Sequence, residues 1–295
     1  MAALSIAVLL TCHNRRAQTC ECLEALRAQA QASKLDVYLV DDGSSDGTAT
    51  AAKSIFPDAT IIRGDGSLFW GGGMRLAFAS AMNVGYDYYL WLNDDTILLP
   101  DAIADLLSHH QQLISQGNIN AILVGSTKDP VTNEPTYGGA VRSKKWYSNK
   151  LEFLPSSSEL KECEAMYGNC VLIPKEVADI VGNIDSNFSH SLGDLDYGLR
   201  ARKKGCSIWL APNYIGYCAQ NTVTGSWIDT NLTILQRLKK VLSIKGFPLK
   251  AWTTFTKRHS GPFWFAYWPL PYIRAVIGYK NLENSPTFTD ATAND

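Results

Sequence analysis

The sequence has no excess of either charge and no paired cysteine motif, and each absence excludes a class of protein. Its 27 basic and 28 acidic residues nearly cancel, so we expect no nucleic-acid partner bound through bulk positive charge. The 7 cysteines are an odd set without C-x-x-C spacing, which predicts reduced thiols rather than a disulfide scaffold or a zinc ribbon. The 295 residues do contain 46% hydrophobic residues, which excludes a disordered chain and suits one large α/β domain, alone or with an appendage.

Two common nucleotide-binding loops are also missing. A dinucleotide site needs G-x-G-x-x-G directly after the first strand, and the sequence there reads TCHNR. The partial match at 64–66 lacks the third glycine at its spacing, and the sequence has no G-x-x-x-x-G-K-[ST] phosphate loop. Hydride transfer and P-loop chemistry are therefore excluded.

Apolar runs typical of strands alternate with helical segments in the first half of the chain. The runs lie at 5–10, 37–40, 60–62, 88–92 and 121–124. We interpret the first run as a buried strand rather than a signal peptide, because no basic segment precedes it and polar residues follow it. This alternation predicts a mostly parallel sheet covered by helices on both faces.

Polar motifs follow three of these runs, at 11–15, 41–48 and 93–96. In sheets of this kind the ligand binds beyond the carboxyl ends of the strands. We therefore expect the three motifs to surround one ligand.

The motif at 93–96 contains the adjacent carboxylates Asp94 and Asp95. Two buried carboxylates need a positive partner, and Mg²⁺ or Mn²⁺ binds through one or two carboxylates together with substrate phosphates. The alternative is that Asp95 and Thr96 cap a turn before the next helix. Because the other strand ends point the same way, we favour a metal–diphosphate site.

The motif at 41–48 offers Asp42 to a base imide or a ribose hydroxyl, since no helix begins close enough for it to cap. Asp46 is instead expected to cap the helix that begins near Thr48. A nucleotide is a ligand that needs both such a carboxylate and a metal for its diphosphate.

The segment 64–75 is expected to be a loop on the ligand side. Its glycines, with Gly72 at the centre, allow close backbone approach to a donor or form a flexible hinge. Phe69 and Trp70 are expected to stack on a sugar, with core packing as the alternative.

Four motifs in order, TCHNR, VDDGSSDGT, LNDDT and GDLDYGLRARKKG, resemble glycosyltransferase family 2, the inverting nucleotide-sugar transferases of GT-A type. The resemblance spans about residues 4–225. GDGSLFWGGGMR and MYGNCVLIPKEV are similar to the branch that builds bacterial surface polysaccharides, including rhamnosyltransferase-like members. The implied fold is a Rossmann-like, mostly parallel sheet flanked by helices.

The resemblance implies a role for each strand-end residue. Thr11 and His13 match positions that hold the nucleotide base, and Asp42 matches the carboxylate that reads the base. Asp94 matches the ribose or diphosphate side, and Asp95 matches the metal ligand, which implies Mn²⁺ or Mg²⁺ as cofactor.

Asp194 matches the aspartate of the Glu-Asp pair that supplies the catalytic base, although Gly193 replaces the glutamate. Asp196 is the reserve candidate, although we expect it rather to cap the same predicted helix, 194–205. His190 is expected to be a structural histidine rather than an additional metal ligand.

The resemblance implies transfer of a sugar from a UDP- or dTDP-sugar to a hydroxyl of a glycan or lipid-linked acceptor, with inversion. Two alternatives remain: a nucleotidyltransferase that makes a sugar nucleotide, and a non-catalytic member that binds nucleotide or glycan. A nucleotidyltransferase needs a glycine-rich basic signature after the first strand, which TCHNRR lacks.

Residues 230–282 contain nine Lys or Arg and no Asp or Glu, with eight aromatics between 252 and 272. Prolines and Arg274 interrupt the apolar run at 261–278, so it is too broken for a transmembrane helix. Basic residues beside Trp and Tyr suit a membrane interface, and packing on the catalytic domain or a dimer contact is the alternative.

These patterns predict a catalytic domain at 1–229, divided into a nucleotide half (1–125) and an acceptor half (126–229). A helical basic and aromatic extension follows at 230–282, and a flexible tail at 283–295. We expect a bacterial cytoplasmic protein in peripheral contact with the inner face of the membrane through 237–278.

Overall fold

The computed structural model describes residues 4–29, 34–143 and 151–278, and the predicted tail at 283–295 lies outside these ranges. Within them, the central sheet has nine strands in the order β3-β2-β1-β4-β11-β6-β12-β5, with β9 paired to β12. The strands are β1 (Ser5–Cys12), β2 (Lys34–Asp41), β3 (Thr60–Arg63), β4 (Tyr88–Leu92), β5 (Ile97–Leu98), β6 (Ala121–Lys128), β9 (Lys161–Cys163), β11 (Cys170–Pro174) and β12 (Ser207–Tyr217).

The first four strands along the chain are parallel, in the order β3-β2-β1-β4. β11 is antiparallel to both β4 and β6, while β6 and β12 are parallel. The carboxyl ends of β1, β2 and β4 therefore meet at one edge of the sheet, as the sequence predicts.

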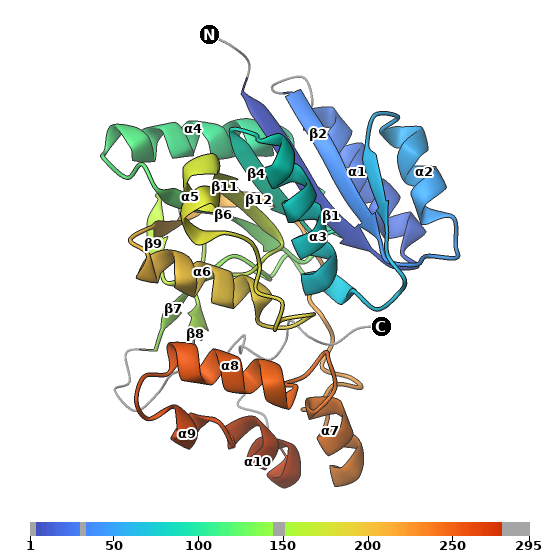
Figure 1. Ribbon diagram of the computed structural model, residues 1–295, viewed down its shortest axis with the longest axis vertical. Coiled ribbons are helices and arrows are strands. Elements are labelled where there is room, and N and C mark those ends of the chain that lie inside the picture. Colours follow the sequence, from blue (N-terminus) through green and yellow to red (C-terminus); the bar gives the residue numbers. More distant parts are fainter. Residues whose placement is uncertain (1–3, 30–33, 144–150, 279–295) are drawn as a thin grey trace.

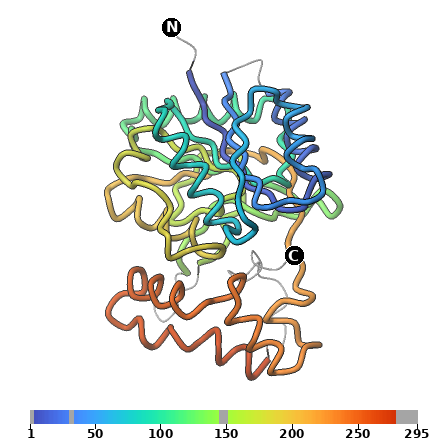
Figure 2. Tube along the Cα trace, turned by 45° about the vertical axis from the view of Figure 1, so that its right-hand side comes forward, coloured from blue at the N-terminus to red at the C-terminus, as the bar shows by residue number. Residues whose placement is uncertain are grey.

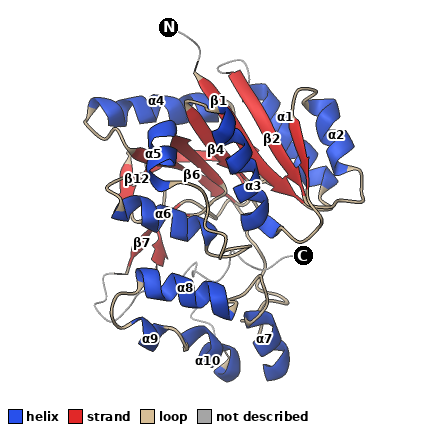
Figure 3. Cartoon of the chain, viewed as in Figure 1, coloured by secondary structure: helices blue, strands red, loops and turns tan. Residues whose placement is uncertain are grey.

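Helices cover both faces of the sheet, which confirms the predicted α/β architecture (Figures 1 and 3). Side chains alternate between the faces of β1, so that Leu9 packs in one core and Val8 and Leu10 pack in the other. One face carries α1 (Arg16–Gln29), α2 (Thr48–Ile55) and α4 (Ala102–Ser115); the other carries α3 (Phe69–Val84), α5 (Lys175–Val181) and α6 (Gly193–Lys203).

All five predicted runs are strands, and the predicted helix at 194–205 is α6. The expected loop at 64–75 is wrong in its second half, because α3 begins at Phe69. The backbone N–H of Phe69 donates to the carboxylate of Asp42 at 2.9 Å, which fixes the start of this helix.

A second layer lies below the sheet in Figures 1 and 2 and contains the C-terminal helices. Phe247 and Phe255 pack there in a third core together with Phe188 and Leu195, so part of the aromatic extension does pack on the rest of the chain. The elements are a three-stranded sheet of β10 (Ala165–Met166), β7 (Gly139–Arg142) and β8 (Leu151–Phe153), and the helices α7 (Ile234–Val241), α8 (Leu249–His259), α9 (Trp264–Tyr267) and α10 (Leu270–Ile277).

None of the helices in the described ranges combines the length and the apolar character needed to cross a membrane.

Candidate active site

A cavity of about 640 Å³ opens at the edge where β1, β2 and β4 end. It is lined by six of the seven predicted site residues: Thr11, His13, Asp42, Asp94, Asp95 and Asp194. The structure therefore brings together motifs that lie up to 183 positions apart in the sequence.

Arg15 joins the two carboxylates that follow β4. Its guanidinium donates to Asp94 Oδ1 at 3.2 Å and to Asp95 Oδ2 at 2.7 Å. Arg15 follows β1, so this pair of contacts connects two neighbouring strand ends. The motif TCHNR contains this arginine, but the sequence alone predicts no role for it.

Asp94 is buried, and the hydroxyl of Thr19 in α1 donates to its carboxylate at 3.2 Å. Burial raises its pKa to about 7, although the charge of Arg15 opposes the shift. Asp95 is more open, with 23% of its side chain exposed, and the thiol of Cys218 donates to its other oxygen at 3.4 Å. Asp95 is therefore the more accessible ligand of the two.

No group of three or more His, Cys, Asp or Glu side chains in the described ranges is arranged to hold a metal ion. An ion such as Mg²⁺ or Mn²⁺ commonly takes one or two protein carboxylates and completes its coordination with waters and substrate phosphates. The donor set of Asp94 and Asp95 fits an ion bound in this way. It does not fit a closed metal site made by the protein alone.

Asp42 is 3% exposed, and both of its oxygens accept backbone hydrogen bonds, from Gly66 at 2.8 Å and from Phe69 at 2.9 Å. Asp42 caps no helix that follows it closely in the sequence; instead it accepts from the N–H of Phe69, the first residue of α3, 27 positions away. It also lines the cavity, and its backbone carbonyl accepts from Nδ1 of His13. Asp42 thus shapes the cavity wall formed by 64–69.

The glycines of α3 approach the protein itself closely. Gly71 and Gly72 donate their N–H groups to the carbonyl of Ser189 at 2.8 and 3.1 Å. A Cβ atom on Gly73 would lie 2.1 Å from Oγ1 of Thr11. Gly72 is the predicted site residue that does not line the cavity; it lies buried in the first turn of α3.

Phe69 and Trp70 both line the cavity. The indole N–H of Trp70 donates to Oδ1 of Asn93 at 2.8 Å, and its ring packs edge-on against Trp91 at 6.1 Å. The two aromatics therefore form part of the cavity wall, with the Trp70 N–H already bonded to the strand end.

Asp194 lies half-buried in the first turn of α6, facing the same cavity. Its two oxygens accept from the backbone N–H groups of Gly168 at 3.0 Å and Leu195 at 2.8 Å. Burial raises its pKa to about 6, against the effect of these two hydrogen bonds. Leu192, just before the helix, has a left-handed backbone with φ 72°, which is a strained conformation for this residue.

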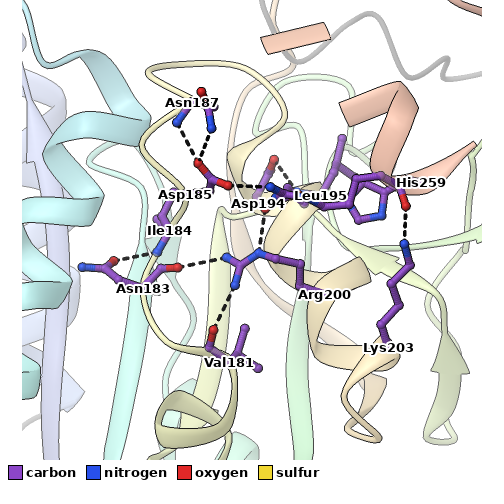
Figure 4. Close-up of polar contacts among 12 residues, drawn as sticks. Val181, Asn183, Ile184, Asp185, Asn187, Asp194, Leu195, Arg200, Lys203 and His259 are labelled. Atoms are coloured by element: carbon purple, nitrogen blue, oxygen red, sulfur yellow. Dashed lines mark hydrogen bonds and ion pairs between the residues drawn. The ribbon is translucent and has the colours of Figure 1, made fainter. Parts of the chain in front are cut away.

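Asp196 has a structural environment. It is fully buried, and its carboxylate pairs with Arg200 at 2.8 Å and with Arg258 of α8 at 2.6 Å. His259 contacts the same carboxylate at 2.8 Å, and Arg258 also pairs with Asp185 at 2.7 Å. Figure 4 shows Asp185, Arg200 and His259 in this region. Burial alone would raise the pKa of Asp196, but these contacts outweigh it and leave the pKa below its ordinary value.

This network excludes Asp196 as the reserve base, because the carboxylate is paired and does not line the cavity. It connects α6 to α8 instead, and so fixes the C-terminal helices against α6. The signal that the sequence offered was Arg200, four residues after Asp196 in the same helix.

The loop between α7 and α8 contributes Lys245 and Phe247 to the cavity lining, which the sequence does not predict. His190 also lines the cavity, and burial together with the charge of Lys245 lowers its pKa to about 4. Further lining residues that the sequence analysis did not single out are Tyr137, Tyr167, Asn169 and Asn221.

The comparisons with known proteins agree with this geometry. The family model described as "Glycosyl transferase family 2" matches residues 7–181, which is more than half of the chain and includes the three strand-end motifs. The chain belongs to glycosyl transferase family 2. Membership confirms the resemblance noted from the motifs.

Among curated proteins, similar sequences include uncharacterized proteins of Mycobacterium tuberculosis (strain ATCC 25618 / H37Rv) and Mycobacterium bovis (strain ATCC BAA-935 / AF2122/97). Each is 28% identical over 166 residues. The match covers 54% of this chain and 58% of each relative. This family 2 chain thus matches little more than half the length of these relatives.

Among solved structures, S. aureus TarS matches with a TM-score of 0.55 and 11% identity, over 86% of this chain and 42% of that chain. The mannosyltransferase PcManGT from Pyrobaculum calidifontis, in complex with GDP-Man and Mn²⁺, matches with a TM-score of 0.54 and 13% identity, over 94% of this chain and 74% of that chain. These likenesses confirm the GT-A type fold of the family 2 chain.

Proposed function

We propose that this protein is an inverting glycosyltransferase that moves a sugar from a UDP- or dTDP-sugar to a hydroxyl of a glycan or lipid-linked acceptor in bacterial surface polysaccharide synthesis. The observation that carries the proposal is that Asp194 and the carboxylates at the ends of β2 and β4 line the same cavity. Family membership supports sugar transfer in general, and the motifs support the finer assignment.

Asp194 is the proposed base. A general base works best when its pKa lies near the operating pH, and a carboxyl group with a pKa of about 6 is largely ionised at neutral pH. The N–H groups of Gly168 and Leu195 hold both of its oxygens in place. Asp194 removes the proton of the acceptor hydroxyl as that oxygen attacks the anomeric carbon, and the nucleoside diphosphate leaves from the opposite face, which inverts the configuration.

Thr11, His13 and Asp42 form the proposed nucleotide end of the cavity, at the ends of β1 and β2. Asp95, with Asp94 beside it, would hold Mn²⁺ or Mg²⁺, which supplies charge stabilisation to the leaving diphosphate. The complex of the mannosyltransferase of similar fold with GDP-Man and Mn²⁺ supports both a nucleotide-sugar donor and a divalent metal. Arg15 holds the two carboxylates together at this end.

A peripheral contact of 237–278 with the inner face of the membrane is part of the proposal. Ten of the sixteen exposed large apolar side chains in the described ranges lie between Ile234 and Ile277, including Phe263 and Phe265. Residues 230–282 also carry no acidic residue, which favours contact with anionic lipid. We retain the division into 1–229, 230–282 and 283–295 on the same grounds.

Release of nucleoside diphosphate tests the function directly. UDP-, dTDP- and GDP-sugars are incubated with the protein and lipid-linked acceptors, with Mn²⁺ and then with EDTA, and the anomeric configuration of the product is read by NMR. We expect release from one donor class, loss of activity in EDTA and an inverted product. Binding of a nucleotide without turnover of any donor would favour a non-catalytic member of the family.

A further inference from the structure

The loop 242–248, between α7 and α8, reaches from the C-terminal helices into the cavity. The hydroxyl of Ser191 donates to the carbonyl of Lys245 at 3.2 Å, which attaches this loop to the segment that leads into α6. The hydroxyl of Tyr272 donates to the carbonyl of Phe247 at 2.9 Å. The Phe247 ring packs against two tryptophans, with ring centroids 5.6 Å apart for Trp227 and 4.8 Å apart for Trp252.

The shape of this loop depends on Gly246. A Cβ atom there would lie 2.5 Å from the carbonyl oxygens of both Lys240 and Val241. The chain therefore turns tightly against the end of α7, and both neighbours of Gly246, Lys245 and Phe247, line the cavity. The tight turn at Gly246 therefore sets the backbone position of Lys245 at the cavity.

His190 lies beside Lys245 at the cavity wall. Its Nδ1 atom is buried and has no hydrogen-bond partner among the described residues. Burial and the charge of Lys245 keep the imidazole neutral at physiological pH. A neutral imidazole adds a hydrogen-bonding atom to this part of the wall without adding charge.

The charges of the cavity lining show what Lys245 contributes. The described lining contains four aspartates and, besides its histidines, two basic side chains, Arg15 and Lys245. Arg15 is paired with Asp94 and Asp95 at the sheet edge. The divalent ion proposed at that edge would be shared between these two carboxylates and a diphosphate, while Asp42 and Asp194 add further negative charge to the lining. Lys245 supplies a positive side chain to the described lining away from that edge.

We propose that Lys245 binds a phosphate group of a substrate in the cavity, with His190 as a neighbouring hydrogen-bonding group. The inference rests on the proposed function and deepens it, because it makes the C-terminal helices part of the substrate site. The diphosphate belongs to the nucleotide donor or to a lipid-linked acceptor. The chemistry at Lys245 is the same in both cases, and the test separates them.

The test compares Lys245→Gln with Lys250→Gln, a matched control in the first turn of α8 that is exposed and does not line the cavity. Nucleoside, nucleoside monophosphate and nucleoside diphosphate of the preferred base are titrated calorimetrically into each protein. Loss of a charge-assisted contact is expected to weaken diphosphate binding about 10- to 100-fold while leaving the nucleoside unchanged. That result assigns Lys245 to the donor.

A second arm titrates farnesyl diphosphate into protein saturated with nucleoside diphosphate. Binding that is lost in Lys245→Gln while nucleotide affinity stays constant assigns Lys245 to the acceptor. Lys245→Arg should restore most of the affected binding, because it keeps the charge. Thermal unfolding shows whether each variant remains folded.

Equal binding of both diphosphates by Lys245→Gln and wild type would overturn the inference. A wild type that binds no nucleotide would instead contradict the proposed function. In that case inorganic pyrophosphate decides about Lys245: binding by wild type but not by Lys245→Gln supports the inference, and any other result overturns it.

Discussion

Replacing Asp194 by asparagine removes the carboxylate that we propose as base while keeping a side chain of nearly the same shape. The carboxylate accepts from the backbone N–H groups of Gly168 and Leu195, and the asparagine oxygen retains one of these contacts. The nucleotide end of the cavity, around Asp42 and Asp95, is not altered. The substitution therefore separates proton removal from donor binding.

The expected magnitude follows from the role of the group. A positioned general base contributes about 10²- to 10⁴-fold to rate, so kcat of Asp194→Asn should fall by about that factor. In the wild type, activity requires the ionised carboxylate. With a pKa of about 6, the ionised fraction of Asp194 is nearly constant above pH 7, and its decline should lower kcat/KM about fivefold between pH 6 and pH 5.

The assay is release of nucleoside diphosphate at pH 5 to 8, with the affinity for that nucleotide measured separately by calorimetry. Nucleotide affinity should change less than about threefold in Asp194→Asn, since a lost rate without lost binding is the signature of a group that acts in the transition state. Asp179→Asn, an exposed surface position in α5, serves as control and should keep wild-type kinetics. A loss of only a few-fold in kcat would refute the assignment of the base.

Three further predictions concern the fold and its surface. Gly73→Ala places a methyl group 2.1 Å from the hydroxyl oxygen of Thr11 in β1 and should lower the free energy of unfolding in urea by about 1–3 kcal/mol. Gly72→Ala places its methyl group 3.3 Å from the nearest atom and should be tolerated, so equal losses would contradict the close packing of α3. Arg258→Met removes one partner of the buried Asp196 carboxylate and should lower the free energy of unfolding by about 3 kcal/mol. Lys257→Met should lower it by less than about 1 kcal/mol, so similar stabilities of the two variants would refute the role of the ion network. Phe265→Ser should weaken sedimentation with anionic vesicles at unchanged melting temperature, and unchanged sedimentation would argue against the membrane contact.

The sequence predicts the strands and their polar ends because both signals are local. Apolar runs mark β1 and β4, and the rule that parallel strands end at one edge places Thr11 and Asp94 together. The sequence predicts Asp42 as a site residue, but it does not predict the contact of Asp42 with Phe69, which lies 27 positions away. The start of α3 depends on that contact, and local propensity cannot reveal it.

Other features depend on register and on the packing of distant segments. The contacts of Arg15 with Asp94 and Asp95 require β1 and β4 to be adjacent. Asp196 and Arg258 are 62 positions apart in the sequence, so the place of Asp196 in the first turn of α6 does not predict this partner. In the sequence, Lys245 is one of the nine basic residues of 230–282, and its position in the cavity follows only from the packing of loop 242–248.

The central claim is that the strand ends bind a nucleoside diphosphate with a divalent metal. Calorimetric titration with UDP, dTDP and GDP, each with Mn²⁺ and then with EDTA, tests it in the wild type and in Asp95→Asn. We expect the wild type to bind UDP or dTDP with an affinity that falls in EDTA. In Asp95→Asn the affinity for the same nucleotide should be reduced to a similar extent even with Mn²⁺ present. Absence of binding to all three diphosphates, or binding that is indifferent to both EDTA and Asp95→Asn, would contradict it.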